Sequence, residues 1–336
     1  MTDNTSAEYH IYGIGAALVD TEIEVTDEDL INLSIDKGLM TLVDEARQEE
    51  LIEALSSHLV ASKRASGGSA ANTIIAASYF GAKSFYSCKV ANDDNGDFYL
   101  RDLSDAGVAS LQGERAAGVT GKCLVMITPD AERTMNTFLG ISETVSVDEL
   151  DTSLIAASQY AYIEGYLVSS ATGRAAAIAL RQQAEAHGVK TALSLSDPAM
   201  VEFFHDGLQE MLGDGVDLLF CNLAEALSFT RTQTLEAAVI ELKKVARSFA
   251  LTLGPEGALI VAGDKSWRID PYKTLAIDTN GAGDMFAGAF LYAITHGYSY
   301  EQAGKLASRA SSQVVSQFGP RLRPEQHQAI LQEILG

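Results

Sequence analysis

The stretch Asp278-Thr-Asn-Gly-Ala-Gly-Asp284, followed directly by MFAGAFLYAIT, says most about the fold of this chain. Gly281 and Gly283 allow the backbone to turn tightly and to approach a ligand closely. The apolar run that follows predicts a helix over residues 283–296. The free N–H groups and the positive dipole end of that helix would form an anion-binding site where it begins.

Asp284 lies at the mouth of this predicted anion site, where its negative charge would repel a bound phosphate. A carboxylate is useful there if it takes a proton from a hydroxyl. The free N–H groups at the start of the helix would then stabilise developing charge on a phosphoryl group. The alternative is an ordinary helix cap with glycines that permit close packing.

Outward from this stretch, strand-like and helix-like runs alternate through the second half of the chain. Such alternation predicts a doubly wound α/β fold, with a mostly parallel sheet and helices on both faces. The expected strands are 159–164, 189–195, 216–221, 249–253 and 258–262. The expected helices are 172–187, 234–247, 283–296 and 299–317.

The first half of the chain is less regular. It predicts a buried strand at 9–15, a half-exposed strand at 18–25, a helix at 45–60 and a strand at 123–128. Two polar, strand-rich segments are expected to form a small β-rich lid over the α/β core. The lid would comprise 17–65 and 115–141, and the core 1–16, 66–114 and 142–336.

Two segments of the first half could bind a polyol. In SGGSAANT at 66–73, Gly67 and Gly68 permit close backbone approach, and Asn72 offers both a donor and an acceptor. A helix cap with packing glycines is the alternative. Asp20, shortly after the first predicted strand, could accept two sugar hydroxyls or could be a solvated surface charge.

Two segments of the second half follow predicted strands, at the sheet edge where open α/β folds bind ligands. Asn222 and Glu225 of Asn-Leu-Ala-Glu could hold a hydrated Mg²⁺, or they could cap a helix. Thr252, Gly254 and Gly257 of Thr-Leu-Gly-Pro-Glu-Gly could cup phosphates with backbone amides, or they could form a hairpin turn.

Composition excludes several classes of protein. With 24 basic and 45 acidic residues, the net charge of −21 argues against nucleic acid or an anionic membrane as a general partner. No apolar run approaches the roughly 18 residues of a membrane span, and no signal peptide is evident. The three scattered cysteines predict reduced thiols and a cytoplasmic location.

Two nucleotide-binding patterns are incomplete. Gly13-Ile-Gly15 lacks the third glycine of the dinucleotide fingerprint, and the segment at 116–123 fails the P-loop pattern at its first and last positions. If ATP binds, the anion site, Mg²⁺ and the turn at 252–257 must hold it.

Together and in this order, the motifs resemble the PfkB (ribokinase-like) family of carbohydrate and nucleoside kinases, from Tyr9 to Arg323. DTNGAGD at 278–284 resembles that family's C-terminal signature. GGSAANT with FYSCKVANDDNG at 85–96 resembles its N-terminal signature, and NLAE at 222–225 is similar to its Asn-x-x-Glu motif. The form DTNGAGD and the stretches SLSDPAMVEFF and VDLLFCNLAEA are most similar to the adenosine kinase branch.

The resemblance implies a ribokinase-like fold and an ATP-dependent kinase that moves the γ-phosphoryl group to a primary hydroxyl of an adenosine-like nucleoside. ATP and Mg²⁺ would be its cofactors, with K⁺ as a further candidate. It would be a monomer or a homodimer, without nucleic-acid or membrane partners.

The resemblance also implies roles for the candidate residues. Asp284 would be the general base, Gly281, Ala282 and Gly283 the anion hole, and Arg133 a lid residue that clamps the phosphates. The acceptor would be bound by Asp20, Gly67, Gly68, Asn72 and Tyr166. The nucleotide would be held by Asn222, Thr252, Gly254, Gly257 and Ser308. The metal ligands would be Asn222 and Glu225 for Mg²⁺ through water, and Asp278 for K⁺.

Three positions depart from the patterns of the family. Ala16 stands where adenosine kinases carry Asn, Tyr166-Leu167 stands where they carry a Phe-Phe pair, and Ser308 stands where ribokinases carry Asn. A PfkB sugar kinase similar to ribokinase or fructokinase is therefore an alternative. A non-catalytic nucleoside-binding protein and an NAD-dependent oxidoreductase are two others. Asp284 argues against the first, because binding alone requires no base, and the second would need the missing glycine fingerprint.

Overall fold

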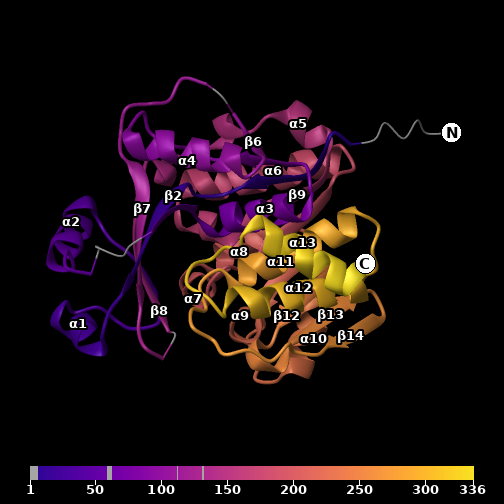
Figure 1. Cartoon of the computed structure of the whole chain (residues 1–336). Coiled ribbons are helices and arrows are strands. Elements are labelled where there is room, and N and C mark those ends of the chain that lie inside the picture. Colours follow the sequence, from indigo (N-terminus) through magenta and orange to yellow (C-terminus); the bar gives the residue numbers. More distant parts are fainter. Residues whose placement is uncertain (1–6, 59–62, 112, 131) are drawn as a thin grey trace.

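Two β-sheets of different size organise the chain (Figure 1). The computed structural model describes residues 7–58, 63–111, 113–130 and 132–336. The larger sheet has nine strands in the order β14-β13-β12-β11-β10-β9-β1-β5-β6. All neighbours from β12 to β6 are parallel, and only β13 and β14 are antiparallel. This is the expected doubly wound, mostly parallel sheet.

The strands of the larger sheet are β1 (Tyr9–Ile14), β5 (Ser84–Ser87), β6 (Val108–Ser110), β9 (Ser158–Glu164), β10 (Lys190–Ser194), β11 (Val216–Asn222), β12 (Ala246–Thr252), β13 (Ala258–Ala262) and β14 (Lys265–Ile269). Its strands are largely buried, because helices cover both of its faces. One face carries α3 (Ser69–Phe80), α4 (Asp94–Asp105), α11 (Ala282–Thr295), α12 (Tyr300–Val314) and α13 (Pro324–Leu335). The other carries α5 (Thr152–Ala156), α6 (Ala171–Ala186), α7 (Pro198–Phe203), α8 (His205–Leu212), α9 (Leu223–Thr230) and α10 (Leu235–Leu242).

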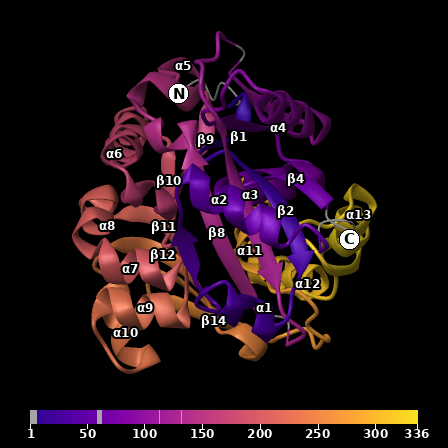
Figure 2. The same ribbon diagram turned by 90° about the vertical axis from the view of Figure 1, so that its left-hand side faces the viewer.

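The smaller sheet has five strands in the order β3-β8-β7-β2-β4. They are β2 (Leu18–Glu24), β3 (Met40–Leu42), β4 (Lys63–Gly67), β7 (Thr120–Ile127) and β8 (Arg133–Gly140). The helices α1 (Asp27–Asn32) and α2 (Glu45–Ala54) accompany them. We call this unit the lid. In Figure 2, where it faces the viewer, β2 and β8 cross in front of the larger sheet.

The lid has a hydrophobic cluster of its own. Ile23 of β2 and Val25 just after it pack with Leu30 of α1 and with Leu51 and Leu55 at α2. The strand expected at 18–25 is present as β2, but the expectation that it is half exposed is wrong. The two helices cover its apolar face, and Asp20 on its polar face is buried as well.

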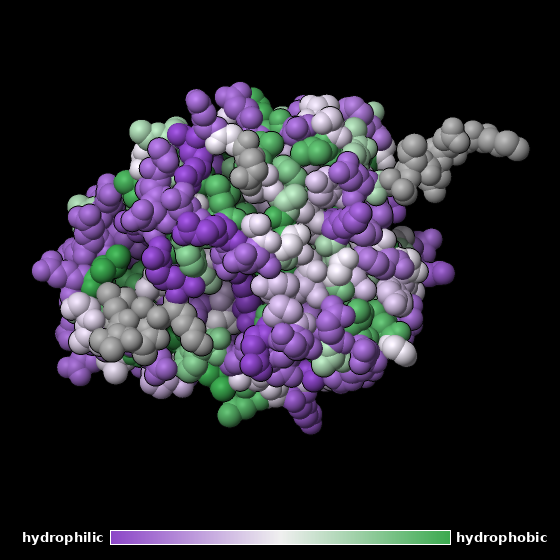
Figure 3. Space-filling view, turned by 45° about the horizontal axis from the view of Figure 1, so that its top comes forward, coloured by the Kyte–Doolittle hydropathy of each residue, from purple (hydrophilic) through white to green (hydrophobic). Residues whose placement is uncertain are grey.

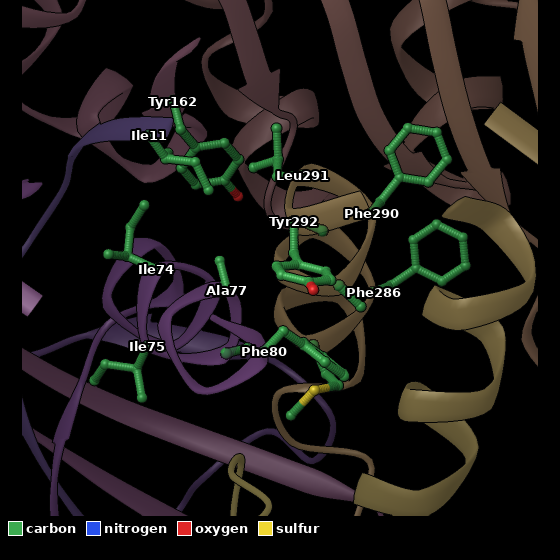
Figure 4. Packing of buried hydrophobic residues seen from close by; sticks show 14 of the residues in the cluster. Ile11, Ile74, Ile75, Ala77, Phe80, Tyr162, Phe286, Phe290, Leu291 and Tyr292 are labelled. Atoms are coloured by element: carbon green, nitrogen blue, oxygen red, sulfur yellow. The ribbon is translucent and has the colours of Figure 1, made fainter. Parts of the chain in front are cut away.

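Helices α3 and α11 pack tightly against each other in the core (Figure 4). Gly288 of α11 makes this possible, because a Cβ there would lie 2.8 Å from the Cβ of Ala76. Ile74 and Phe80 of α3 lie in the same buried cluster as Phe290 of α11. The contact matters for function, because both helices begin at the same end of the larger sheet.

Other differences from the expected elements are local. The helix expected at 234–247 ends at Leu242, because β12 begins at Ala246. β14 and α13 were not expected at all. In the described part of the chain, no helix has both the length and the apolar character needed to cross a membrane. The face shown in Figure 3 is mainly hydrophilic, as the acidic composition predicts.

Candidate active site

A cavity of about 370 Å³ lies between the lid and the carboxyl ends of the parallel strands. Five strands of the larger sheet each contribute a residue at or just after their ends. These residues are Ala16, Glu164, Ser194, Asn222 and Thr252. Ligands of open α/β sheets bind at this edge, so the topology itself places the site here.

The loop before α11 forms one wall of the cavity, with Gly281, Ala282, Gly283 and Asp284 among its lining residues. Gly281 is the N-cap of α11 and has a left-handed φ of 72°. A side chain there would also meet Pro320, whose Cβ would lie 2.5 Å away. No side chain in the described structure caps this helix, so its first N–H groups can bind an anion.

Asp284 lies in the first turn of α11 and receives two hydrogen bonds from α3. The Ser69 hydroxyl donates to its Oδ1 at 2.6 Å, and the Asn72 amide donates to its Oδ2 at 3.3 Å. Burial raises the pKa of Asp284, while these two bonds and the charge of Arg133 oppose the rise. A carboxylate with a raised pKa beside a helix N-terminus can act as a general base on a hydroxyl.

Asp20 of β2 lines the cavity together with residues at the start of α3. Its side chain is buried, and burial, followed by the nearby charge of Glu22, raises its pKa well above the ordinary value. A Cβ on Gly67 would collide with the Asp20 carboxylate, so only glycine allows this approach. Gly68 is the N-cap of α3, with a φ of 94°.

Glu164, at the end of β9, is a buried carboxylate of the cavity that the motifs did not indicate. It accepts hydrogen bonds from the Ala70 N–H at 2.7 Å and the Ala16 N–H at 3.2 Å. Burial raises the pKa of Glu164 to about 7. The sequence feature that could have indicated Glu164 as a site residue is its position as an acidic residue at the end of an otherwise apolar predicted strand.

Asn222 and Glu225 adopt the capping arrangement at the start of α9 and also line the cavity. Glu225 accepts from the Asn222 N–H at 2.9 Å and from the Asn222 side-chain amide at 2.7 Å. Burial raises the pKa of Glu225 to about 7. A divalent cation nearby would favour the charged carboxylate, so this buried oxygen donor fits a hydrated Mg²⁺.

Arg133 of β8 reaches the cavity from the lid and forms no ion pair with any described residue. Burial opposes its charge, but Tyr166 and the carboxylates of Asp284 and Asp197 raise its pKa. Tyr166, in the 3₁₀ turn Gly165–Ser169, donates its hydroxyl to Asp197 at 3.4 Å. Both side chains line the cavity or its rim and can meet a bound substrate.

The lid contributes many of the apolar side chains that line the cavity. They are Leu18, Met40, Leu42, Met135 and Leu139, and we call them the roof. The lid also contributes polar groups, such as Asp20 of β2 and Arg133 of β8, while Asn72 and Asp284 of the core form a polar floor. The cavity therefore offers both apolar surface and hydrogen-bonding groups to a ligand.

Residues 33–327 of the chain match the model of the pfkB family of carbohydrate kinases. The chain belongs to this family. It is accordingly an ATP-dependent kinase that acts on an alcohol group.

Individual relatives span nearly the whole PfkB chain. An adenosine kinase of Saccharomyces cerevisiae is 28% identical over 331 residues, which are 91% of this chain and 95% of that one. The structures of a probable sugar kinase from Rhizobium etli CFN 42 and of adenosine kinase from Sinorhizobium meliloti are each 32% identical, with a TM-score of 0.91. Each alignment covers 97% of this chain, and 99% and 100% of the respective relatives.

The PfkB cavity gathers most of the residues expected from the sequence, but not all. Those that line it are Asp20, Gly68, Asn72, Arg133, Tyr166, Asn222, Glu225, Thr252, Gly281, Ala282, Gly283 and Asp284. The others lie outside its lining: Gly67, Gly254, Gly257, Asp278 and Ser308. Gly67 contacts the site through Asp20, as described above.

The remaining four lie beyond the cavity wall. Gly254 and Gly257 flank a 3₁₀ turn after β12, both with positive φ, so the turn itself is as expected. The Ser308 hydroxyl donates to the backbone oxygen of Asp270 at 3.1 Å. Asp278 is buried and accepts the N–H groups of Asn280 and Gly319, each at 2.8 Å. Asp278 thus fixes the loop behind the anion site.

Proposed function

We propose that this kinase phosphorylates a primary hydroxyl of an adenosine-like nucleoside. The observation that carries the proposal is the set of five apolar lid residues in the roof of a cavity that also holds the polar side chains of Asn72 and Asp284. A ribose can occupy the floor near Asp20 and Asn72 while a purine lies under the roof beside Tyr166. A free sugar would leave the apolar roof without a partner.

In this proposal Asp284 takes the proton of the acceptor hydroxyl as the phosphoryl group is transferred. Ser69 and Asn72 orient the carboxylate, and the amides of Gly281, Ala282 and Gly283 stabilise the transferring group. Asn222 and Glu225 would hold Mg²⁺ through water, and the bound ion supplies neutralisation of phosphate charge. Thr252 and the turn at 254–257 would support the nucleotide.

A substrate panel tests the acceptor directly. Adenosine, inosine, ribose and fructose would each be offered with ATP and Mg²⁺, and kcat/KM measured. We expect adenosine to exceed both free sugars by roughly 100-fold or more, since only the nucleoside buries an apolar group under the roof. Inertness of every nucleoside together with good turnover of a sugar would overturn the proposal.

A PfkB sugar kinase is the second candidate, and two residues favour it. Ala16 and Leu167 depart from the adenosine kinase pattern, and Leu167, although it lines the cavity, has no ring to stack on a base. The same panel decides between the two candidates, because fructose and ribose are its sugar members.

The segments 17–65 and 115–141 act, in this proposal, as a lid that closes over both substrates. Closure excludes water and brings Arg133 to the phosphates. The outer face of the lid sheet is covered by α1 and α2, which favours a monomer over a dimer that pairs lid faces. Light scattering of the purified chain measures its mass in solution and so distinguishes a monomer from a dimer.

K⁺ binding near Asp278 is a further part of the proposal. Each oxygen of this buried carboxylate accepts one backbone N–H, which leaves lone pairs for a cation that would set the shape of the anion loop. We expect activity to rise when K⁺ replaces Na⁺ at constant ionic strength. An equal rate in the two salts would leave Asp278 a purely structural role.

A further inference from the structure

Three consecutive residues, Gly319, Pro320 and Arg321, contact three separate parts of the active site. The Gly319 N–H donates to Asp278 behind the anion loop. Pro320 packs against Gly281, where a Cβ would lie 2.5 Å from its own. The Arg321 side chain reaches across to the acceptor side. This segment therefore joins regions that the sequence separates by more than 200 residues.

Arg321 is bound on all three of its guanidinium nitrogens. Nε donates to Asn72 Oδ1 at 3.2 Å, Nη1 to Asp102 Oδ2 at 2.7 Å, and Nη2 to the Ser66 hydroxyl at 2.9 Å. Ser66 itself donates its hydroxyl and its N–H to Asp102. Only 14% of the Arg321 side chain is exposed. The planar guanidinium is thereby held in one orientation.

The contact with Asn72 has a direct consequence for the acceptor site. Because Oδ1 of Asn72 accepts from Arg321, the amide group Nδ2 is the end that faces Asp284, at 3.3 Å. The opposite orientation would place the amide oxygen against a carboxylate and the NH₂ group against a guanidinium. Arg321 therefore decides that Asn72 presents a donor to Asp284 and to the cavity.

We propose that Arg321 is a positioning residue for the acceptor site, and that it acts by holding the Asn72 amide in the orientation that donates to Asp284 and to the acceptor. This inference rests on the proposed function, because it takes the cavity near Asn72 as the acceptor site. It adds a residue from the segment between α12 and α13 that makes no contact with the acceptor itself.

Electrostatics support the assignment. Burial would raise the pKa of Asp102, yet Arg321 and the Ser66 bonds hold it below the ordinary value. Asp102 is thus a charged partner that anchors Arg321 from the side away from the cavity. On the cavity side, the charge of Arg321 also opposes the strong rise in the pKa of Asp20.

The alternative is that Arg321 only fastens the C-terminal segment to α3 and α4. The two roles differ in what they change. If Arg321 only fastens the segment, its replacement should reduce stability and should lower kcat and both substrate affinities together. A positioning role affects the acceptor and the protonation of Asp284, and leaves ATP binding intact.

The test compares Arg321→Met with Arg323→Met, using the acceptor that the wild-type chain turns over best. Arg323 is the matched control, because it lies in the same segment, is exposed, and among the described residues its side chain bonds only to Gln326. For Arg321→Met we expect the KM of the acceptor to rise roughly 10- to 100-fold, the scale of a lost charged hydrogen bond. The KM of ATP should stay within about twofold, and Arg323→Met should match the wild type.

The pH profile supplies a second readout. Loss of the Asn72 bond removes one of the contacts that hold down the pKa of Asp284, so the acid limb of kcat should move to higher pH in Arg321→Met. The other charged groups that act with Asp284 are Asp20, Glu164, Glu225 and Arg133. The substitution leaves all of these in place.

A double-mutant cycle with Asn72→Ala tests the route of the effect. If Arg321 acts through Asn72, adding Arg321→Met to Asn72→Ala should change the acceptor KM by less than about threefold. Additive effects would overturn the inference, as would a uniform fall in kcat and in both affinities. A wild-type chain that turns over neither nucleoside nor sugar would instead overturn the proposed function, and this inference with it.

Discussion

At the scale of single residues, the account depends on where carboxylates and arginines lie around one cavity. Asp284 could be placed from the sequence, because two glycines and a helix pattern surround it. Glu164 could not be placed from the sequence. It ends a predicted strand, and the strand pattern does not indicate that the backbone amides of two distant segments donate to its carboxylate. The role of Arg321 could not be predicted from the sequence either, because its three hydrogen-bond partners come from β4, α3 and α4.

Arg133 carries the first residue-scale prediction. Arg133→Ala should lower kcat by roughly 10- to 100-fold and weaken acceptor binding much less, because its charge acts on the phosphoryl group. Steady-state kinetics with acceptor and ATP varied in turn measure both effects. Arg47→Ala is the control, because Arg47 lies on the lid helix α2 and pairs with Glu50. It should leave kcat and acceptor affinity unchanged. Loss of acceptor affinity with unchanged kcat would contradict the clamp.

At the scale of elements, sequence patterns located most strands of the larger sheet to within a few residues. Alternation predicts the strand β2 but overstates its exposure, because the burial of Asp20 at the cavity depends on tertiary contacts that a strand pattern does not contain. Helix α13 is absent from the predicted elements, although Pro324 in its first turn and the four-residue spacing of Ile330 and Ile334 are typical of a helix.

Helix α13 carries the element-scale prediction, through its buried His327. The Nδ1 of His327 donates to the Arg323 carbonyl oxygen at 3.0 Å, while Nε2 is buried and has no hydrogen-bond partner among the residues that the structure describes. Burial lowers the pKa of His327 to about 4. The unfolded chain therefore takes up a proton near pH 6.5 and the folded chain only near pH 4. The neutral His327 therefore contributes to the free energy of unfolding in full above pH 6.5. As the pH falls below 6.5, the folded protein loses this stability progressively, by up to about 3 kcal/mol.

Urea unfolding between pH 8 and pH 4 measures this loss. His327→Leu should flatten the pH dependence of the unfolding free energy below pH 6.5, because the uncharged side chain has no proton to gain. His187→Gln changes an exposed histidine and should keep the wild-type slope. If His327→Leu and the wild type lose stability in parallel, the buried histidine is not responsible.

At the scale of the whole molecule, the lid is a unit with its own sheet and its own hydrophobic cluster. It can therefore move without losing its internal packing. One contact joins it to the anion loop, where the Asn280 side-chain amide donates to Glu22 at 3.4 Å. The lid was expected from the polar, strand-rich character of its segments, but this contact with the loop was not.

Hydrogen exchange tests the motion of the lid. We expect amide exchange in β7 and β8 to slow when ATP and the acceptor are both present, because closure shields the inner face of the lid sheet. Exchange in β14, at the far edge of the larger sheet, should stay the same and serves as the internal control. Equal exchange in β7 and β8 with and without substrates would exclude closure.

The measurement that tests the central claim most directly is the single-turnover rate of phosphoryl transfer by Asp284→Asn. Asparagine keeps the size of the side chain and an oxygen that can accept from the Ser69 hydroxyl, and removes the base. The account predicts a fall in rate of about 10²- to 10⁴-fold, with folding and with ATP and acceptor binding largely retained. A folded Asp284→Asn enzyme that transfers phosphate within a few-fold of the wild-type rate would contradict the mechanism.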